Sequence, residues 1–295
     1  MKPSSLTLRR SIDIFIKVLS IVASLVGIVF LIWILWDVVT KGITALDINF
    51  FTKRTGPFTI ADTGMANAIV GTLYITLLAT VIGVPIGLLG GIYLSEFGRN
   101  HPVSTVVRFF ANILMGTPSI LIGIFVYAVI VLPMSGFSGF SGGVALAIIM
   151  LPVVVRTTED ILILVPNELR ESALALGSPH WKMITQIVFR AARAGLITGV
   201  ILAIARVSGE TAPLLFTAFN NSHFTYYDAE SPLRYIYDMS KPTANLTVTI
   251  FNYAMTPYEQ WQKQAWAGSL LITGAILVIS VIARAFFSGG KTRRG

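Results

Sequence analysis

The chain has 295 residues, of which 54% are hydrophobic and only 12% are charged, and its mean hydropathy is +0.76. These values lie outside the range of soluble globular proteins and indicate an integral membrane protein. With no cysteine, the chain cannot form a disulfide framework or a thiolate metal site. The net charge of +8 does not indicate a nucleic-acid partner, because the basic residues cluster just outside the apolar segments, as membrane orientation requires.

Six apolar segments are long enough to cross a bilayer, since a spanning helix needs about 20 largely apolar residues. They cover residues 14–36, 66–94, 109–132, 142–163, 186–217 and 265–286. The first follows two arginines, as a secretory signal does, but its apolar run is longer than the roughly 7 to 15 residues of a signal. We therefore predict an all-α polytopic membrane protein, with residues 1–295 forming a single transmembrane domain.

The distribution of Lys and Arg predicts the orientation. If both termini are cytoplasmic, fifteen of these residues lie on the inner side of the membrane and six on the outer side. Because cytoplasmic segments carry the excess of positive charge, both termini are expected to be cytoplasmic.

Two loops are too long to be simple connections. The outer loop, residues 218–264, contains "HFTYYDAESPLRYIYDMSKP", whose aromatic residues suit either the membrane interface or a docking partner. The inner loop, "VPNELRESALALGSPHWKMI", has the pattern of two short helices, with Pro166 and Asn167 starting the first and Gly177 stopping it. We expect this amphipathic inner helix to bind a partner.

The inner loop resembles the cytoplasmic loop of ABC importer permeases, whose signature is Glu-Ala-Ala, three residues and a glycine. Glu171, Ser172, Ala173 and Gly177 occupy those positions, and Glu168 precedes them on the polar face. Ser172 replaces the second alanine with another small residue. The resemblance implies that residues 165–184 hold the coupling helix, which seats in a groove of the ATP-hydrolysing subunit.

The resemblance extends over most of residues 67–218 and points to the permeases of bacterial phosphate importers. The blocks that carry it are "NAIVGTLYITL", "IYLSEF", "GTPSILIGIFVY", "LPVVVRTTEDILILVPNELRESALALG" and "ARVSGETAPLLFTA". It implies the type I ABC importer permease fold, a place in the bacterial inner membrane, a second permease subunit, a pair of ATPases and an extracytoplasmic phosphate-binding protein. ATP and Mg²⁺ would be bound by the ATPases, with no cofactor in this chain.

The alternatives are a permease for another oxyanion, an ion-coupled secondary carrier, and a signalling membrane protein without transport. A secondary carrier is expected to show internal repeats, which we do not detect. The chain also lacks a phosphate-binding loop of its own, because "SGGKTRRG" has Ala285 where the first glycine is required. Neither a Ser/His/Asp set nor a metal-ligand cluster is evident, so we expect no enzyme activity.

The fifth apolar segment carries two charges, Arg206 and Glu210, in "ARVSGETAPL". Residues four apart share a helix face, and charges at this depth should face protein or a watery cavity. They form either a structural ion pair or an anion path in which the guanidinium binds an oxyanion and Glu210 holds it when no anion is bound. Gly209 and Pro213 would allow the helix to bend.

A second arginine, Arg156, occurs in "VVVRTTEDIL" with Glu159 and Asp160 one turn later. It lies either at the inner end of the fourth span or within the transport cavity, and the sequence does not decide between them.

Overall fold

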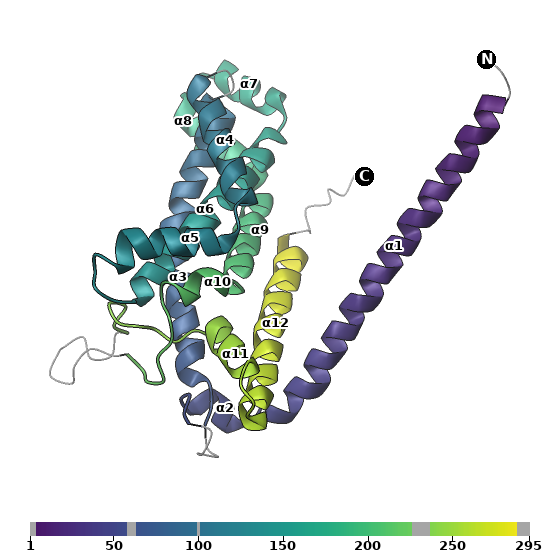
Figure 1. The fold of residues 1–295 in the computed structure, drawn as a ribbon. Coiled ribbons are helices and arrows are strands. Elements are labelled where there is room, and N and C mark those ends of the chain that lie inside the picture. Colours follow the sequence, from purple (N-terminus) through teal and green to yellow (C-terminus); the bar gives the residue numbers. More distant parts are fainter. Residues whose placement is uncertain (1–3, 58–62, 99–100, 226–236, 288–295) are drawn as a thin grey trace.

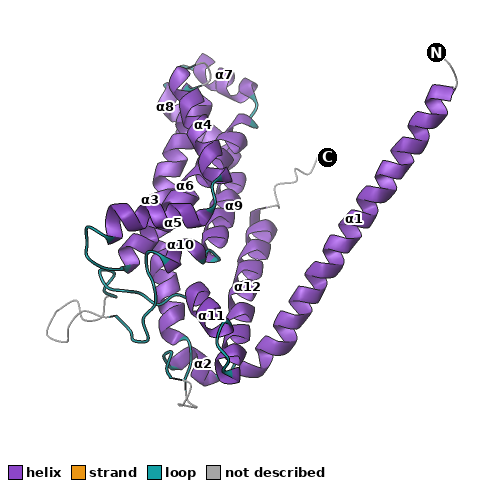
Figure 2. Ribbon diagram, viewed as in Figure 1, coloured by secondary structure: helices purple, strands orange, loops and turns teal. Residues whose placement is uncertain are grey.

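The computed structural model describes residues 4–57, 63–98, 101–225 and 237–287. Every regular element in these ranges that contains more than one residue is a helix (Figure 2), which confirms the all-α prediction. The elements in chain order are α1 (Ser4–Gly42), η1 (Ile43–Ala45), α2 (Ile48–Thr52), α3 (Ala66–Ile92), η2 (Tyr93–Phe97), α4 (Pro102–Gly116), α5 (Ser119–Val126), η3 (Tyr127–Val131), α6 (Gly139–Ile163), α7 (Asn167–Ala175), α8 (His180–Met183), η4 (Ile184–Val188), α9 (Phe189–Ser208), α10 (Ala212–Leu215), α11 (Leu246–Ala254) and α12 (Glu259–Phe287). The η1 segment is a 3₁₀ helix, and η2, η3 and η4 are π-helices.

Within the described residues, five helical stretches are long and apolar enough to cross a membrane. They are Leu8–Ala45, Ala66–Phe97, Gly139–Ile163, His180–Ser208 and Glu259–Ala285. The bent pair Pro102–Gly116 and Ser119–Val131 supplies a sixth if it is counted as one broken span. All six predicted segments therefore coincide with apolar helices, although two of them differ in shape from the prediction.

The third predicted span, 109–132, is broken and not continuous. The helix axis turns by 104° between α4 and α5. Thr117 at the break has an extended backbone, with ψ of 133°. Pro118 explains this conformation, because a proline ring disfavours the helical backbone of the residue before it.

The fifth predicted span, 186–217, is displaced toward its start. A continuous helix runs from His180 through η4 to Ser208, so the second short helix expected in the inner loop is the first turn of this span. The helix ends at Gly209, and the chain forms a separate short helix, α10. Pro213, which lacks an N–H and clashes with the preceding turn, is tolerated only because it lies in the first turn of α10.

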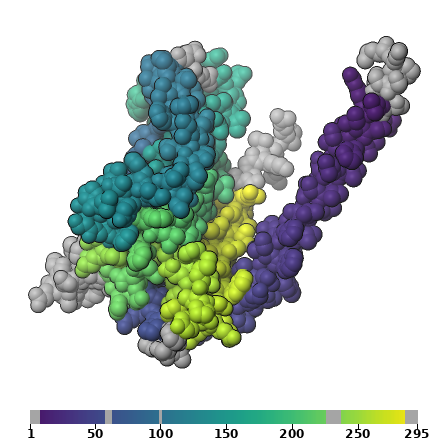
Figure 3. Space-filling model, viewed as in Figure 1, coloured from purple at the N-terminus to yellow at the C-terminus, as the bar shows by residue number. Residues whose placement is uncertain are grey.

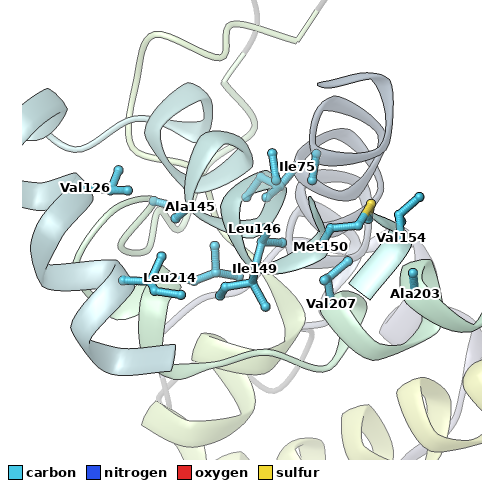
Figure 4. Close-up of a cluster of buried hydrophobic side chains, with 14 of the residues drawn as sticks. Ile75, Val126, Ala145, Leu146, Ile149, Met150, Val154, Ala203, Val207 and Leu214 are labelled. Atoms are coloured by element: carbon cyan, nitrogen blue, oxygen red, sulfur yellow. The ribbon is translucent and has the colours of Figure 1, made fainter. Parts of the chain in front are cut away.

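The central packing is between α3 and α6. Glycines on α3 bring the two backbones close together: a Cβ atom on Gly87 would lie 2.7 Å from Val154 Cβ, and one on Gly91 would lie 2.5 Å from Thr158 Cβ. Small residues permit such close approach between membrane helices. The largest buried apolar cluster surrounds α6 and includes residues of α3, α5, α9 and α10 (Figure 4). This core holds the broken helices against the straight ones.

Helix α1 stands away from the rest of the bundle over most of its length (Figures 1 and 3). Its contact with α12 is near Gly42, where an added Cβ would lie 2.8 Å from Leu270 Cβ. The N-terminal end of α1 and the C-terminal end of α12 point toward the same side of the molecule as α7 (Figure 1). Six spans, with α4 and α5 counted together as one, would give this arrangement.

Candidate functional site

Glu159 on α6 is buried between two arginines. Its side chain is 2% exposed; Oε1 accepts a hydrogen bond from Arg108 Nε at 2.6 Å, and Oε2 accepts one from Arg156 Nη1 at 2.7 Å. Arg108 lies on α4, so this contact joins α4 to α6. Arg156 also lies 4.0 Å from Asp160, whose side chain is 65% exposed. We call Arg108, Arg156 and Glu159 the arginine cluster.

The arginine cluster carries more positive than negative charge. Its two guanidiniums share one buried carboxylate, and the solvated Asp160 lies near Arg156 alone, so it compensates only part of one positive charge. The side chains of Arg108 and Arg156 are 29% and 30% exposed, so neither is fully enclosed. The sequence singled out Arg156 but not Arg108, because no local spacing connects Arg108 to a residue 51 positions later. The cluster can therefore interact with an anion.

Arg206 and Glu210 line a cavity of about 110 Å³ between α4, α5, α6 and the end of α9. The prediction that they share one helix face is wrong, because α9 ends at Ser208. Beyond it, the N–H groups of Gly209 and Glu210 donate to the carbonyls of Arg206 and Val207 in a tight turn. The salt bridges within the described residues do not include one between Arg206 and Glu210. Arg206 and Glu210 nevertheless line the same cavity.

This cavity and the arginine cluster lie along the same helix faces. Ile149 and Val153 of α6 line the cavity, and Arg156 follows Val153 by three residues. Residues three or four apart share a face, and a rise of about 1.5 Å per residue places Arg156 about 5 Å farther along α6 than Val153. On α4, Met115 lines the cavity and Arg108 precedes it by two turns. The positive groups are therefore arranged in sequence along the path from the cavity toward α7.

Both helix breaks occur beside the cavity. Thr117 and Ser119 line it from the break between α4 and α5, and Glu210 lines it from the break between α9 and α10. Pro213 is buried against α5, where a Cβ on Gly123 would lie 2.6 Å from its Cα. Irregular backbone at membrane depth is tolerated where it is buried in protein or lines a cavity, and this site meets that condition.

Helix α7 exposes both polar and apolar side chains. Glu168, Glu171 and Ser172 are exposed, whereas Ala173 is 4% exposed and packs in a cluster formed by the ends of α6, α8 and α9. Ala173, one of the residues expected at the docking surface, therefore lies on the side of α7 that faces the helix bundle. Arg170, which the sequence analysis did not single out, also lies on that side and pairs with Glu96.

Gly177 ends α7 as its position in the sequence predicts. Its φ is +79°, a conformation that favours glycine. The N–H of Ser178 donates to the carbonyl of Ala173 at 3.1 Å, and the N–H of Gly177 donates to that of Leu174 at 2.9 Å. This pair of bonds is the Schellman arrangement, and it fixes the angle at which the chain leaves α7.

A larger cavity, of about 920 Å³, lies at the opposite end of the molecule from α7 and is lined by Lys53, Arg54 and His223, with no carboxylate among its described lining residues. Tyr253 also lines it, and burial raises the pKa of its hydroxyl to about 12 despite hydrogen bonds with Gly56 and Thr55. The outer loop contributes α11 to this end, while residues 226–236 of that loop lie outside the described residues.

These features define a class of protein: a multi-pass membrane protein with broken helices beside a charged cavity and an exposed helix beyond α6, the most buried of its spans. The family model described as "Binding-protein-dependent transport system inner membrane component" matches residues 83–288, and the chain belongs to that family, the permease subunits of ABC importers in the inner membrane. This family works with ATPase and permease partners.

Curated relatives place the chain more narrowly. It is 47% identical to the "Phosphate transport system permease protein PstA" of Yersinia pestis, over 96% of this chain and 92% of the relative. The protein of the same name from Xylella fastidiosa strain Temecula1 is 46% identical over 96% of this chain and 95% of the relative. A "Probable phosphate transport system permease protein PstA" of Methanocaldococcus jannaschii is 34% identical over 88% of each chain.

Solved structures agree on the fold. A chain of the inward-facing MetNI methionine ABC transporter matches with a TM-score of 0.57 and 15% identity, over 75% of this chain and 92% of that chain. A chain from an amino acid ABC transporter crystallised with histidines matches with a TM-score of 0.51 and 17% identity, over 75% and 89% of the two chains. At these identities the likeness shows the fold, the type I ABC permease fold expected from the sequence.

Proposed function

We propose that this chain is the permease subunit through which an ATP-driven importer passes inorganic phosphate. The observation that carries the proposal is its 44% to 47% identity to five curated phosphate permeases, over at least 91% of its length. The charges inside the bundle support the same substrate class, because paired guanidinium donors suit a tetrahedral oxyanion better than a lysine ammonium does.

The proposed anion path begins at the Arg206 cavity and continues to the arginine cluster. Arg206 would bind the oxyanion at the helix breaks, and Glu210, which lines the same cavity, would compete for the guanidinium when no anion is bound. Arg156 and Arg108, already sharing one carboxylate, would offer the next positive site on the inner side. A series of moderate sites lets an ion enter without being held too tightly to leave.

The breaks at Pro118 and Gly209 are the proposed points of bending between outward-open and inward-open states. They border the cavity from two sides, so a change in the angle between α4 and α5, or between α9 and α10, would change its size. Hinge residues that absorb such a change commonly lie at the ends of elements. Pro213, packed against α5, would move with that helix.

Helix α7 and the start of the following helix form the proposed docking surface for the ATPase subunit. Glu168, Glu171 and Ser172 supply its polar part, and Gly177 sets its exit angle. Large apolar side chains are exposed around it, and their exposed fractions are 80% for Leu164, 43% for Leu174, 89% for Leu176 and 65% for Trp181. An apolar patch with a polar rim is typical of a protein interface.

The remaining partners follow from this assignment. A second permease subunit would complete the path, two ATPases would bind ATP and Mg²⁺ and hydrolyse the nucleotide, and an extracytoplasmic phosphate-binding protein would deliver the substrate. Both termini and α7 would face the cytoplasm, as the excess of basic residues on that side indicates.

The test is radiolabelled phosphate uptake by proteoliposomes that contain the assembled complex and the binding protein. Uptake that requires ATP and that excess sulfate does not compete supports the proposal. Equal competition by sulfate would indicate a permease for another oxyanion. Uptake by this chain alone, driven by an ion gradient, would indicate a secondary carrier instead.

A further inference from the structure

A buried ion pair fastens α7 to the inner end of α3. Arg170 of α7 donates from Nη2 to Glu96 Oε1 at 2.8 Å and from Nε to Glu96 Oε2 at 3.2 Å. The side chains are 9% and 3% exposed, and the residues are 74 positions apart in the chain. Two parallel bonds between a guanidinium and a carboxylate fix orientation as well as distance, so α7 and η2 cannot turn independently while this pair is intact.

The same guanidinium also holds the end of α6. Arg170 Nη2 donates to the carbonyl of Leu162 at 2.8 Å, and Nη1 donates to the carbonyl of Val165 and to Asn167 Oδ1. Carbonyls at a helix C-terminus lack partners within the helix, and Arg170 supplies them. One side chain therefore connects α7 with both central helices, α6 and α3.

Glu96 belongs to η2, which also contacts the arginine cluster. The carbonyl of Leu94, two residues before Glu96, accepts a hydrogen bond from Arg108 Nη2 at 3.3 Å, and Arg108 Nε holds Glu159. The five-residue π-helix η2 is therefore hydrogen-bonded to two arginines, to Arg170 through the Glu96 carboxylate and to Arg108 through the Leu94 carbonyl. Short π-helical segments within α-helices occur frequently at functional sites.

We propose that Arg170 and Glu96 are positioning residues, which transmit movement of the docking helix α7 through η2 to Arg108 in the anion path. When the ATPase displaces α7, the ion pair carries η2 with it, and the Leu94 carbonyl then repositions the Arg108 guanidinium next to Glu159. This inference rests on the proposed function, because it takes α7 as the ATPase docking helix. A contiguous set of contacts is required for such coupling but must be tested by perturbing it.

The test uses the absence of native cysteine. A single Ser119→Cys substitution in the cavity beside Arg206 gives a thiol whose labelling rate reports access to the path. In the reconstituted complex, the labelling rate is measured with and without ATP, while ATP hydrolysis and phosphate uptake are measured in parallel complexes that keep Ser119. Glu96→Gln, Arg170→Gln and the double substitution are compared with Asp13→Asn, which removes an exposed charge on α1.

If the Arg170–Glu96 pair transmits movement of α7, its removal should uncouple phosphate transport from ATP hydrolysis without abolishing hydrolysis. In the Glu96→Gln and Arg170→Gln complexes, ATP should no longer change the labelling rate, and phosphate transported per ATP should fall by about 10-fold, within the usual range of coupling factors. The double substitution should be no worse than either single one, because both act on the same contact. Asp13→Asn should behave as the unsubstituted protein.

Retained coupling in an assembled single or double variant would overturn the proposal. A double variant that fails to assemble, although it leaves no buried charge unpaired, would assign the pair to folding alone and would overturn it too. Failure of the complex with its native sequence, Ser119 included, to transport phosphate, although it assembles and hydrolyses ATP, would instead contradict the proposed function.

Discussion

Replacement of Glu159 by glutamine should destabilise the chain through the arginine cluster. The substitution keeps the side-chain shape but replaces one acceptor oxygen with an N–H₂ donor that faces a guanidinium donor. Removal of one partner from a buried pair costs about 3 to 5 kcal/mol. Because Arg108 and Arg156 are 29% and 30% exposed, water recovers part of this cost, and we expect a loss of about 2 kcal/mol.

The structure also predicts which second substitution restores stability. Arg156 has Asp160 within 4.0 Å, whereas Arg108 is left with the carbonyl of Leu94. Arg108 is therefore the guanidinium that suffers most when Glu159 is neutralised. Adding Arg108→Gln to Glu159→Gln should recover most of the lost stability, and adding Arg156→Gln should recover less.

The assay is thermal unfolding of the purified chain in detergent, followed by intrinsic fluorescence. A loss of about 2 kcal/mol should lower the midpoint by about 4 to 8 °C, by analogy with soluble domains of similar size. The reasoning is refuted if Glu159→Gln leaves the midpoint unchanged, or if Arg156→Gln is the better rescue.

Three further outcomes are expected. Gly177→Ala should destabilise the end of α7 by about 1 to 2 kcal/mol and weaken ATPase binding in pull-down titrations. Gly274→Ala should not, because an added Cβ there also meets open space but the residue has no positive φ. Equal binding by both variants would contradict the role of φ. Gly91→Ala should disrupt the contact of α3 with α6, lowering the yield of monodisperse protein, and a normal yield would show that the helices can separate without cost. Reporters fused after Ser178 and after Asn221 should be active inside and outside the cytoplasm respectively, and the reverse pattern would overturn both the orientation and the docking assignment.

The sequence predicted the positions of the membrane helices because a span is a local property. About 20 apolar residues in succession suffice to identify one, and each predicted segment coincides with an apolar helix. The end of α7 could also be predicted from local sequence, because the N–H groups of Gly177 and Ser178 bond to carbonyls in the last turn of the same helix.

The helix breaks were harder to predict, although their residues are visible in the sequence. A proline or glycine within an apolar segment is compatible with a continuous, kinked membrane helix, so the segment around Pro118 was expected to be one span. Its 104° turn depends on packing: α5 lies against Pro213 of α10, which is far away in the chain. Similarly, α9 ends at Ser208, so Glu210 lies outside the helix that contains Arg206. Beyond this end, Pro213 packs against α5.

The charge partners could not be predicted from one sequence. Arg108 is 51 residues from Glu159, and Arg170 is 74 residues from Glu96. Neither spacing has a local signature, and Arg170 stood in a segment whose charged residues were expected to face the partner. Only the packing of α4 and α7 against the central helices brings these side chains together.

The central claim is that the charges in the Arg206 cavity move phosphate and do not merely hold helices together. The most direct measurement is ATP-dependent phosphate uptake by proteoliposomes with Arg206→Gln and Glu210→Gln combined, normalised to the amount of assembled complex. The double substitution removes both charges and leaves neither unpaired, so assembly should be retained while uptake is lost, and Arg206→Lys alone should retain part of the rate because a point charge replaces the fork. Uptake at the unsubstituted rate in the double variant would contradict the account.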